Sequence, residues 1–316
     1  MATGAPVLSE EQVAQYHELG YATVEGVFTP EQTRELQAVT DHFIELSRQD
    51  SYEAQCLRYA GDSDQPSSLF DLEPEHTAER PLPRRLNSPV GSHECYRAAM
   101  HNPAMLDIAE QLLGPSGIRL HAEKLNMKLG GVGSPVQFHQ DWAYYPYSND
   151  DGLAIGVAID DIDASNGAMQ VVPRSHKGEI FDHHFDGHFS GAITDPNFDA
   201  IVSGAIPLEV KAGGITIHHV RMIHGSETNT SERPRRFLLF ALAAADAWPL
   251  RGVPDIEAWD SKLLRGEPTL HPRVEANPVR IPLPGIVKGG SIYENQSVVA
   301  NARFKREELI ERQAAL

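Results

Sequence analysis

The sequence predicts an all-β core with flanking helices, of the sandwich or jelly-roll type. From about residue 118 the chain becomes a series of short β-rich runs separated by turn signals. One of these signals, Asn166-Gly167, is typical of a β-hairpin, and Gly213-Gly214 marks another turn. Helical patterns are absent between the β-rich runs, whereas a parallel α/β sheet would need them there.

The start of the chain predicts two amphipathic helices. Ser9 precedes an apolar pattern of helical spacing that stops at Gly20. A short strand should follow, and then Thr29, Pro30 and Gln32 combine an N-cap, a proline at the first helical position and a capping-box glutamine. Apolar residues at spacings of three and four continue from there, as expected for a surface helix.

The middle of the chain changes from irregular to β-rich. Residues 51–92 are polar and rich in proline, so we expect loops, and the amphipathic run 104–114 predicts a third helix. Residues 134–146 should form a strand and a turn. Further strands are predicted at 118–129, 153–160, 168–173, 206–210, 215–223 and 235–244.

We interpret residues 1–316 as one domain in three parts. A helical N-terminal part covers about 8–115, the jelly-roll core about 118–248, and a loop-rich C-terminal extension 249–316, which ends in a charged helix from Phe304. The connection 176–206 is long enough to be functional or a lid, with His183, His184 and His188 solvated within it.

Composition and charge narrow the classes of partner. Hydrophobic residues make up 41% and charged residues 22% of the chain, which is ordinary for a soluble globular protein. A formal charge of −17 argues against nucleic acid or an anionic membrane as a partner, since both need a basic surface. The longest apolar run, Phe237–Ala245, is far shorter than the ~20 residues of a membrane helix. A small-molecule partner remains, and the sequence gives no signal for an oligomeric state.

Cysteine usage and the first residues suggest a cytoplasmic protein. Cys56 and Cys95 form no CxxC pair, so neither a thiolate zinc site nor a disulfide framework is expected. No basic segment followed by an apolar stretch stands at the start, so we expect no signal peptide.

Three residues could together hold a metal ion. Residues i and i+2 of a strand project from the same face, so His139 and Asp141 could bind one ion. His224, just beyond a β-rich run and followed by Gly-Ser, is the best candidate for a third ligand. Two imidazoles and a carboxylate are a donor set suited to iron(II). His218 should lie on the face of His224, where it would support the site or pack.

Arg235 begins the next predicted strand. An arginine fork holds a carboxylate through two parallel hydrogen bonds, so this residue could anchor a dicarboxylate. The alternative is a surface arginine flanking a buried strand, and Arg233 and Arg236 are neighbours with which it could be confused.

These motifs resemble the phytanoyl-CoA dioxygenase family. The resemblance lies in HQD at 139–141, NG at 166–167, VVPRSH at 171–176 and HGS…N…RR from 224 to 236, in the family's order and spacing. It covers about residues 10–245 and implies a double-stranded β-helix, a cupin-like jelly roll, as a single oxygenase domain. It also implies an enzyme that uses Fe(II), 2-oxoglutarate and O2.

The resemblance also assigns roles to residues. It implies His139, Asp141 and His224 as iron ligands and Arg235 with Ser226 as the 2-oxoglutarate anchor. Lys128 or Asn126 could also contact 2-oxoglutarate, or both could lie on a solvated edge. Possible substrate contacts are Trp142, Tyr144, Tyr145, Arg174 and Lys124.

The expected reaction is hydroxylation of an unactivated C–H bond in a small metabolite or natural-product intermediate, with succinate and CO2 as coproducts. Alternatives with the same cofactors are acyl-CoA hydroxylation, desaturation, epoxidation and ring closure. A cupin-like zinc or manganese enzyme would use the same ligands without needing Arg235. A non-catalytic sensor that binds 2-oxoglutarate is the third class.

Overall fold

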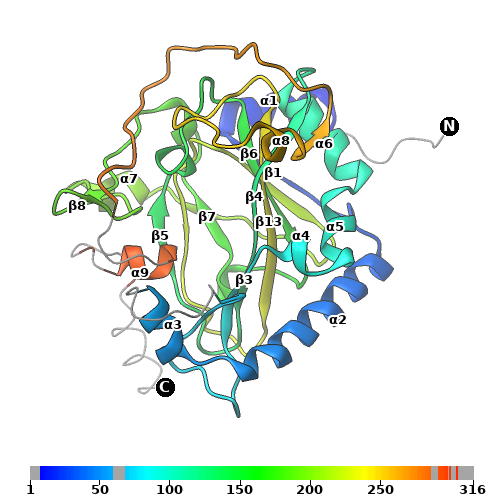
Figure 1. Cartoon of the computed structure of the whole chain (residues 1–316), viewed down its shortest axis with the longest axis vertical. Helices are drawn as coiled ribbons and strands as arrows, with labels where there is room; N and C mark the ends of the chain where they lie inside the picture. The colour runs from blue at the N-terminus through cyan, green and yellow to red at the C-terminus, as the bar shows by residue number, and fades with distance from the viewer. Residues whose placement is uncertain (1–7, 60–67, 286–290, 298, 300–303, 305–316) are drawn as a thin grey trace.

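A computed structural model describes residues 8–59, 68–285, 291–297, 299 and 304. Two antiparallel sheets face each other, which confirms the predicted jelly roll (Figure 1). Every strand pair within the two sheets is antiparallel. The site described below lies between these sheets.

The larger sheet has the order β1-β11-β6-β13-β4-β3-β2, with β14 also paired to β4. Its strands are β1 (Tyr21–Val24), β2 (Phe70–Leu72), β3 (Pro83–Asn87), β4 (Ile118–Lys128), β6 (Gly152–Ala158), β11 (Ile215–His219), β13 (Arg235–Ala244) and β14 (Leu263–Arg265). The smaller sheet has the order β10-β7-β12-β5. It consists of β5 (Val136–His139), β7 (Met169–Val171), β10 (Ile206–Pro207) and β12 (His224–Ser226).

Helices α1 to α6 precede β4 in the sequence. They are α1 (Glu10–Leu19), α2 (Pro30–Leu46), α3 (Tyr52–Tyr59), α4 (Pro89–Ser92), α5 (Glu94–Met100) and α6 (Pro103–Leu113). Helices of five residues each follow later, namely α7 (Phe198–Val202), α8 (Ile256–Asp260) and α9 (Ile292–Gln296). Single 3-10 turns occupy Ser47–Gln49, Asp141–Ala143, Ala164–Asn166 and Ser175–Lys177.

The N-terminal helices cover the outer face of the larger sheet. The capping box predicted at Thr29 is present, and Ser9 forms a second capping box that the sequence analysis did not predict. Leu36 and Phe43 of α2 are buried in the same cluster as Ile155 and Leu238 of the larger sheet. This packing leaves the inner face of the sheet free to form a site.

Two predictions about local structure were wrong. Residues 51–92 contain α3, β2, β3 and α4 rather than loops only. Strands β2 and β3 extend the larger sheet beyond β4. They form through this strand pairing, and their sequences lack the strong apolar alternation that would have predicted them. The sequence Asn166-Gly167 ends a 3-10 turn and is not a hairpin, because β6 and β7 belong to different sheets.

The connection 176–206 is more ordered than the sequence suggests. It contains the hairpin β8 (His184–Phe185) and β9 (His188–Phe189) as well as α7. His183 and His184 are buried, so the expectation of solvated histidines was wrong for these two.

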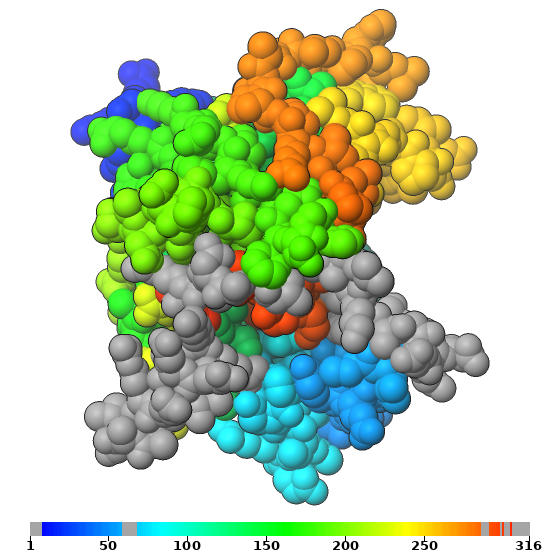
Figure 2. Space-filling model, turned by 90° about the vertical axis from the view of Figure 1, so that its left-hand side faces the viewer, coloured from blue at the N-terminus to red at the C-terminus, as the bar shows by residue number. Residues whose placement is uncertain are grey.

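The described part of the C-terminal extension lies across the rest of the molecule. In Figure 2 its orange part lies over the yellow and green segments, and α9, in red-orange, lies lower on the same face. Residues 305–316 of the predicted final helix lie outside the described residues. Within the described part of the chain, no helix combines the length and apolar character needed to cross a membrane.

Packing of α2 can be tested by truncating Leu36, which is buried against the larger sheet. We expect Leu36→Ala to lower the free energy of unfolding by about 2–5 kcal/mol, because it removes apolar contacts and leaves a cavity. Urea denaturation followed by circular dichroism measures this change. The exposed neighbour Glu35→Ala is the control and should stay within about 0.5 kcal/mol of the parent. Equal effects of the two substitutions would contradict the packing described.

Candidate metal centre

Strand pairing brings the two histidines of the predicted site together. In the smaller sheet β12 pairs with β5, and His224 lies directly opposite His139. Asp141 begins the 3-10 turn that follows β5, and Gln140 between them is extended, with φ −122° and ψ 126°. An extended residue sends its two neighbours to the same side, so His139 and Asp141 face the same space.

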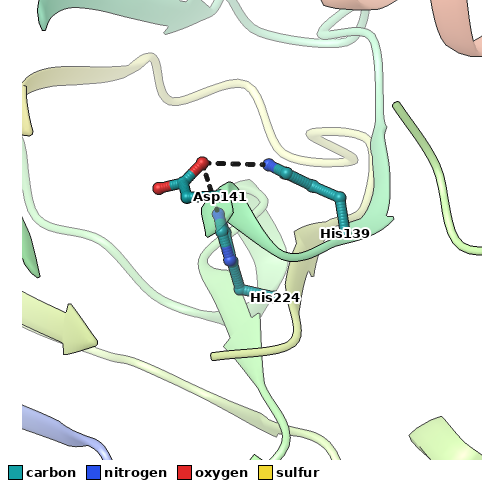
Figure 3. Close-up of side chains that lie close together, drawn as sticks. All are labelled: His139, Asp141 and His224. Carbon is teal, nitrogen blue, oxygen red and sulfur yellow. Dashed lines mark ion pairs between the residues drawn. The ribbon is translucent and has the colours of Figure 1, made fainter. Parts of the chain in front are cut away.

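The three side chains converge on one point (Figure 3). One oxygen of Asp141, Oδ1, lies 3.7 Å from His139 Nε2 and 3.9 Å from His224 Nε2. The three ligand atoms all lie within 4.8 Å of one another, and all three residues are buried. This arrangement leaves the other side of a bound ion open to the cavity, as in the two-histidine, one-carboxylate iron sites.

Hydrogen bonds fix which imidazole nitrogen is available. His139 Nδ1 lies 2.9 Å from the carbonyl of Gln137, and His224 Nδ1 lies 3.0 Å from the carbonyl of Met222. A carbonyl can only accept, so Nδ1 must carry the proton in both rings and Nε2 is left with a lone pair. Metal-bound histidines are oriented by this kind of contact. The residues therefore fit a divalent iron ion.

The charge states also suit a metal. Burial favours the neutral form of Asp141, but His224, His139, His218 and Lys124 outweigh it and hold the carboxyl pKa well below its usual range. Burial, with His139 and His218, lowers the pKa of His224 well below its usual value. An ionised carboxylate beside a neutral imidazole is the protonation state that metal binding requires.

The central residue of the HQD motif holds the motif in place. Gln140 is fully buried; its amide nitrogen donates to the carbonyls of Glu179 and Arg221, and its amide oxygen accepts from Phe181 N–H. His183 Nε2 accepts a hydrogen bond from the Gln140 N–H at 2.9 Å, and burial lowers the pKa of this histidine to about 3. The connection 176–206 thus braces the turn that carries Asp141.

His218 of β11 lies beside the carboxylate. Its Nε2 lies 3.5 Å from Asp141 Oδ2, the oxygen that does not face the other two histidines. It lines the same cavity and is buried, and neither ring nitrogen has a hydrogen-bond partner. A group in this position orients the carboxylate, which agrees with the supporting role expected from the sequence.

A cavity, called here the central cavity, surrounds these residues. Arg235 lines it from β13, where its Nε and Nη2 donate to the carbonyl of Gly167 at 3.2 and 3.1 Å. Its Nη1 is buried without a partner, and burial lowers the pKa of this arginine to about 10, so it stays charged at neutral pH. Arg236 points the other way and pairs with Asp160 and Asp41, while Arg233 pairs with Asp163.

Gly156 leaves room for the ring of Phe237, which lines the cavity. The ring of Phe237 lies below the Arg235 guanidinium, with the guanidinium carbon 5.3 Å from the ring centroid. A Cβ atom at Gly156 of β6 would come within 1.9 Å of this ring. Any larger residue at 156 would therefore push Phe237 toward the space below Arg235.

Four other polar residues, on β4 and β12, were predicted to contact 2-oxoglutarate or the substrate. Three of them line the cavity. Ser226, Asn126 and Lys124 do so, and Asn126 also accepts a hydrogen bond from Arg85. Lys128 does not. Its ammonium donates to the carbonyls of Ser226 and Glu227, so it supports β12 from outside the cavity.

The residues predicted to contact substrate are scattered. Tyr145 lines the central cavity and, with Tyr144, a second cavity walled by the start of the C-terminal extension. Trp142 is buried away from both and donates to the carbonyl of Pro278. Arg174 is exposed and pairs with Glu18, so the structure gives it a surface role.

Several lining residues were missed by the sequence reasoning, among them Arg85 of β3 and Ile292 of α9. Neither belongs to a motif, and β3 lies in the segment interpreted as loop. For Arg85 the alternation in PRRLN would have been the only signal.

Comparison with known proteins decides the family. The sequence model described as Phytanoyl-CoA dioxygenase (PhyH) matches residues 16–237. The chain belongs to the phytanoyl-CoA dioxygenase family. Membership confirms the resemblance seen in the motifs and makes the protein a non-haem iron dioxygenase that depends on 2-oxoglutarate. The zinc or manganese enzyme and the sensor are thereby set aside.

Individual relatives differ in what they act on. A probable alpha-ketoglutarate-dependent hypophosphite dioxygenase of Stutzerimonas stutzeri is 34% identical over 93% of this chain and 99% of its own length. An ectoine dioxygenase of Bordetella bronchiseptica is 26% identical over 73% of this chain and 74% of its own. The crystal structure of EctD from S. alaskensis with 2-oxoglutarate and 5-hydroxyectoine shares the fold, with a TM-score of 0.61 and 21% identity. The match covers 86% of this chain and 88% of that chain.

The assignment of His224 can be tested by substitution. We expect His224→Ala to abolish iron-dependent conversion of 2-oxoglutarate to succinate, because two remaining ligands cannot hold the ion. Succinate formation and iron content after desalting measure the effect. His271→Ala, at an exposed histidine, is the matched control and should retain both. Full 2-oxoglutarate consumption by His224→Ala would contradict the ligand set.

His218 should behave differently from a ligand. We expect His218→Phe to weaken Fe(II) binding by about 10–100-fold without abolishing it, because the free oxygen of Asp141 loses its neighbour. Anaerobic metal titration of the two variants compares the effects. A loss as complete as that of His224→Ala would instead identify His218 as a fourth ligand.

Proposed function

We propose that the protein oxidises a small free molecule with Fe(II), 2-oxoglutarate and O2, through the site built by His139, Asp141 and His224. Convergence of these three side chains in one cavity with Arg235 is the observation that carries the proposal. The general reaction is hydroxylation of a C–H bond, with succinate and CO2 as coproducts. Bound iron supplies the activation of O2 that drives this chemistry.

The chain's own residues bind and orient the cosubstrate. Arg235 would hold the distal carboxylate of 2-oxoglutarate through its unpaired Nη1, with the Ser226 hydroxyl beside it. The Phe237 ring below the guanidinium and the Gly167 carbonyl keep this arginine in one orientation. A buried, preoriented guanidinium loses little entropy when the diacid binds.

A free small molecule is favoured over an acyl-CoA thioester. The central cavity must accept iron, 2-oxoglutarate and the reacting part of the substrate together. The nucleotide of coenzyme A carries several phosphates and would need a basic docking surface. A chain with a formal charge of −17 supports no such surface overall.

A second candidate reaction is oxidation of a P–H bond. The Stutzerimonas stutzeri relative is a probable hypophosphite dioxygenase and matches this chain over almost its whole length. Hypophosphite, O2 and 2-oxoglutarate would give phosphite, succinate and CO2, with one oxygen atom replacing P–H by P–OH and the other entering succinate. The Lys124 ammonium in the cavity lining favours this anion.

The cosubstrate anchor gives the decisive test. We expect Arg235→Met to raise the KM for 2-oxoglutarate about 30-fold or more, because the distal carboxylate loses its buried charged partner. Succinate formed with Fe(II), with and without a chelator and a substrate panel, is the measurement. Arg233→Met is the matched control, at an exposed arginine two residues away. Iron-independent turnover, or equal KM values in the two variants, would refute the proposal.

A further inference from the structure

Lys124 of β4 is a cation without a protein partner in the central cavity. It lines the cavity together with Asp141 and His218, and no hydrogen bond or ion pair is formed by its ammonium among the described residues. Burial lowers the pKa of Lys124, and Arg85 lowers it further, whereas Asp141 opposes both. Lys124 is half-buried, and a cation with little access to water and no protein partner is costly, so the position suits a group that an anion completes.

Strand register separates Lys124 from the cosubstrate anchor. Arg235 pairs with Lys128, whereas Lys124 pairs with Leu239, four residues further along β13. Four residues of strand span roughly 13 Å at ~3.3 Å per residue. Lys124 therefore belongs to the metal end of the cavity, where it interacts with Asp141.

The formal charges of the cavity residues, iron and 2-oxoglutarate together leave one positive charge unmatched. Arg235 and Lys124 are cations and Asp141 is an anion, while Fe(II) and the dianion 2-oxoglutarate cancel each other. The Arg85 guanidinium lies 3.6 Å from Asp71 and is matched by it. With histidines counted as neutral, the loaded site carries one net positive charge.

The space beside Lys124 suits a compact ligand. Iron and 2-oxoglutarate would fill part of the cavity, which limits the space left for a substrate. Three alanines, Ala122, Ala154 and Ala241, line the cavity two residues in register from the Lys124–Leu239 pair and leave room there, and Tyr145 and Ile292 line the same cavity. His218, whose Nδ1 is buried without a partner, adds a polar group that could contact the ligand.

We propose that Lys124 binds a compact monoanionic substrate at the metal end of the central cavity. The inference rests on the proposed function, since it assumes that iron and 2-oxoglutarate occupy the remainder of the cavity. A monoanion neutralises the unmatched charge, whereas a dianion overcompensates it and a neutral molecule leaves Lys124 unpaired. Lys124 thus selects the substrate by charge, and Arg235 selects the cosubstrate.

Anaerobic calorimetry on the full chain loaded with Fe(II) and 2-oxoglutarate tests the proposal. The titrants are hypophosphite and formate as monoanions and acetamide as a neutral control, at constant ionic strength. We expect at least one monoanion to bind the parent protein and to bind Lys124→Met about 30-fold or more weakly. The affinity for 2-oxoglutarate should stay unchanged. Lys211→Met, at an exposed lysine, is the matched control and should bind like the parent.

Three outcomes would overturn the inference. The first is that neither monoanion binds the parent protein, and the second is that Lys124→Met binds them equally well. The third is that Lys124→Met weakens 2-oxoglutarate instead, which would make Lys124 part of the cosubstrate site. Thermal unfolding of Lys124→Met verifies that the variant is folded. Succinate formed by the parent without any substrate tests the proposed function separately, so the two failures can be told apart.

Discussion

Pairing of β12 with β5 is the constraint on which the site depends. It sets His224 opposite His139 in the smaller sheet, while the turn after β5 brings Asp141 to the same side. Side chains alternate along a strand, so a slip of one residue would turn the His224 ring to the other face and dismantle the centre. The neighbouring pairs of β12 with β7 resist that slip, as does the connection 176–206 through His183 and Gln140. The positions of the three ligand side chains are thus set by the strand register and not by any single contact.

The same site concentrates polar groups that the fold leaves unsatisfied. Arg235 Nη1 and His218 Nδ1 are buried without hydrogen-bond partners among the described residues, although buried polar groups are normally paired. Both residues line the central cavity. Leu36 and Phe43 of α2 pack on the opposite face of the larger sheet, where apolar burial is continuous, and this packing stabilises the fold. Stability and function are therefore divided between the two faces of one sheet.

The sequence predicted the elements with strong local signals. A capping box located α2, an apolar pattern between Ser9 and Gly20 located α1, and β-rich runs placed β4 and β13 correctly. It could not reveal that β6 and β7 belong to different sheets, because a turn signal does not say which strands pair. His139, Asp141, His224 and Arg235 could be named from residue chemistry and family motifs. The sequence could not show that Lys128 turns to the carbonyls of β12 and the residue after it, because alternation gives the face of a strand but not the path of a long side chain.

Different parts of the chain build the metal centre and the remaining wall of the cavity. Two of the three ligands come from paired strands of the smaller sheet and the cosubstrate anchor begins β13, so the register that forms the fold also specifies the reaction class. The remaining wall includes single positions of β4, Tyr145 after the metal-binding turn, and Ile292 of α9 far along the chain. A change of side chain at those positions need not alter the strand pairing. One fold can therefore keep its iron chemistry while its substrate changes, and Lys124 is the cation of that wall for which we propose a role in substrate choice.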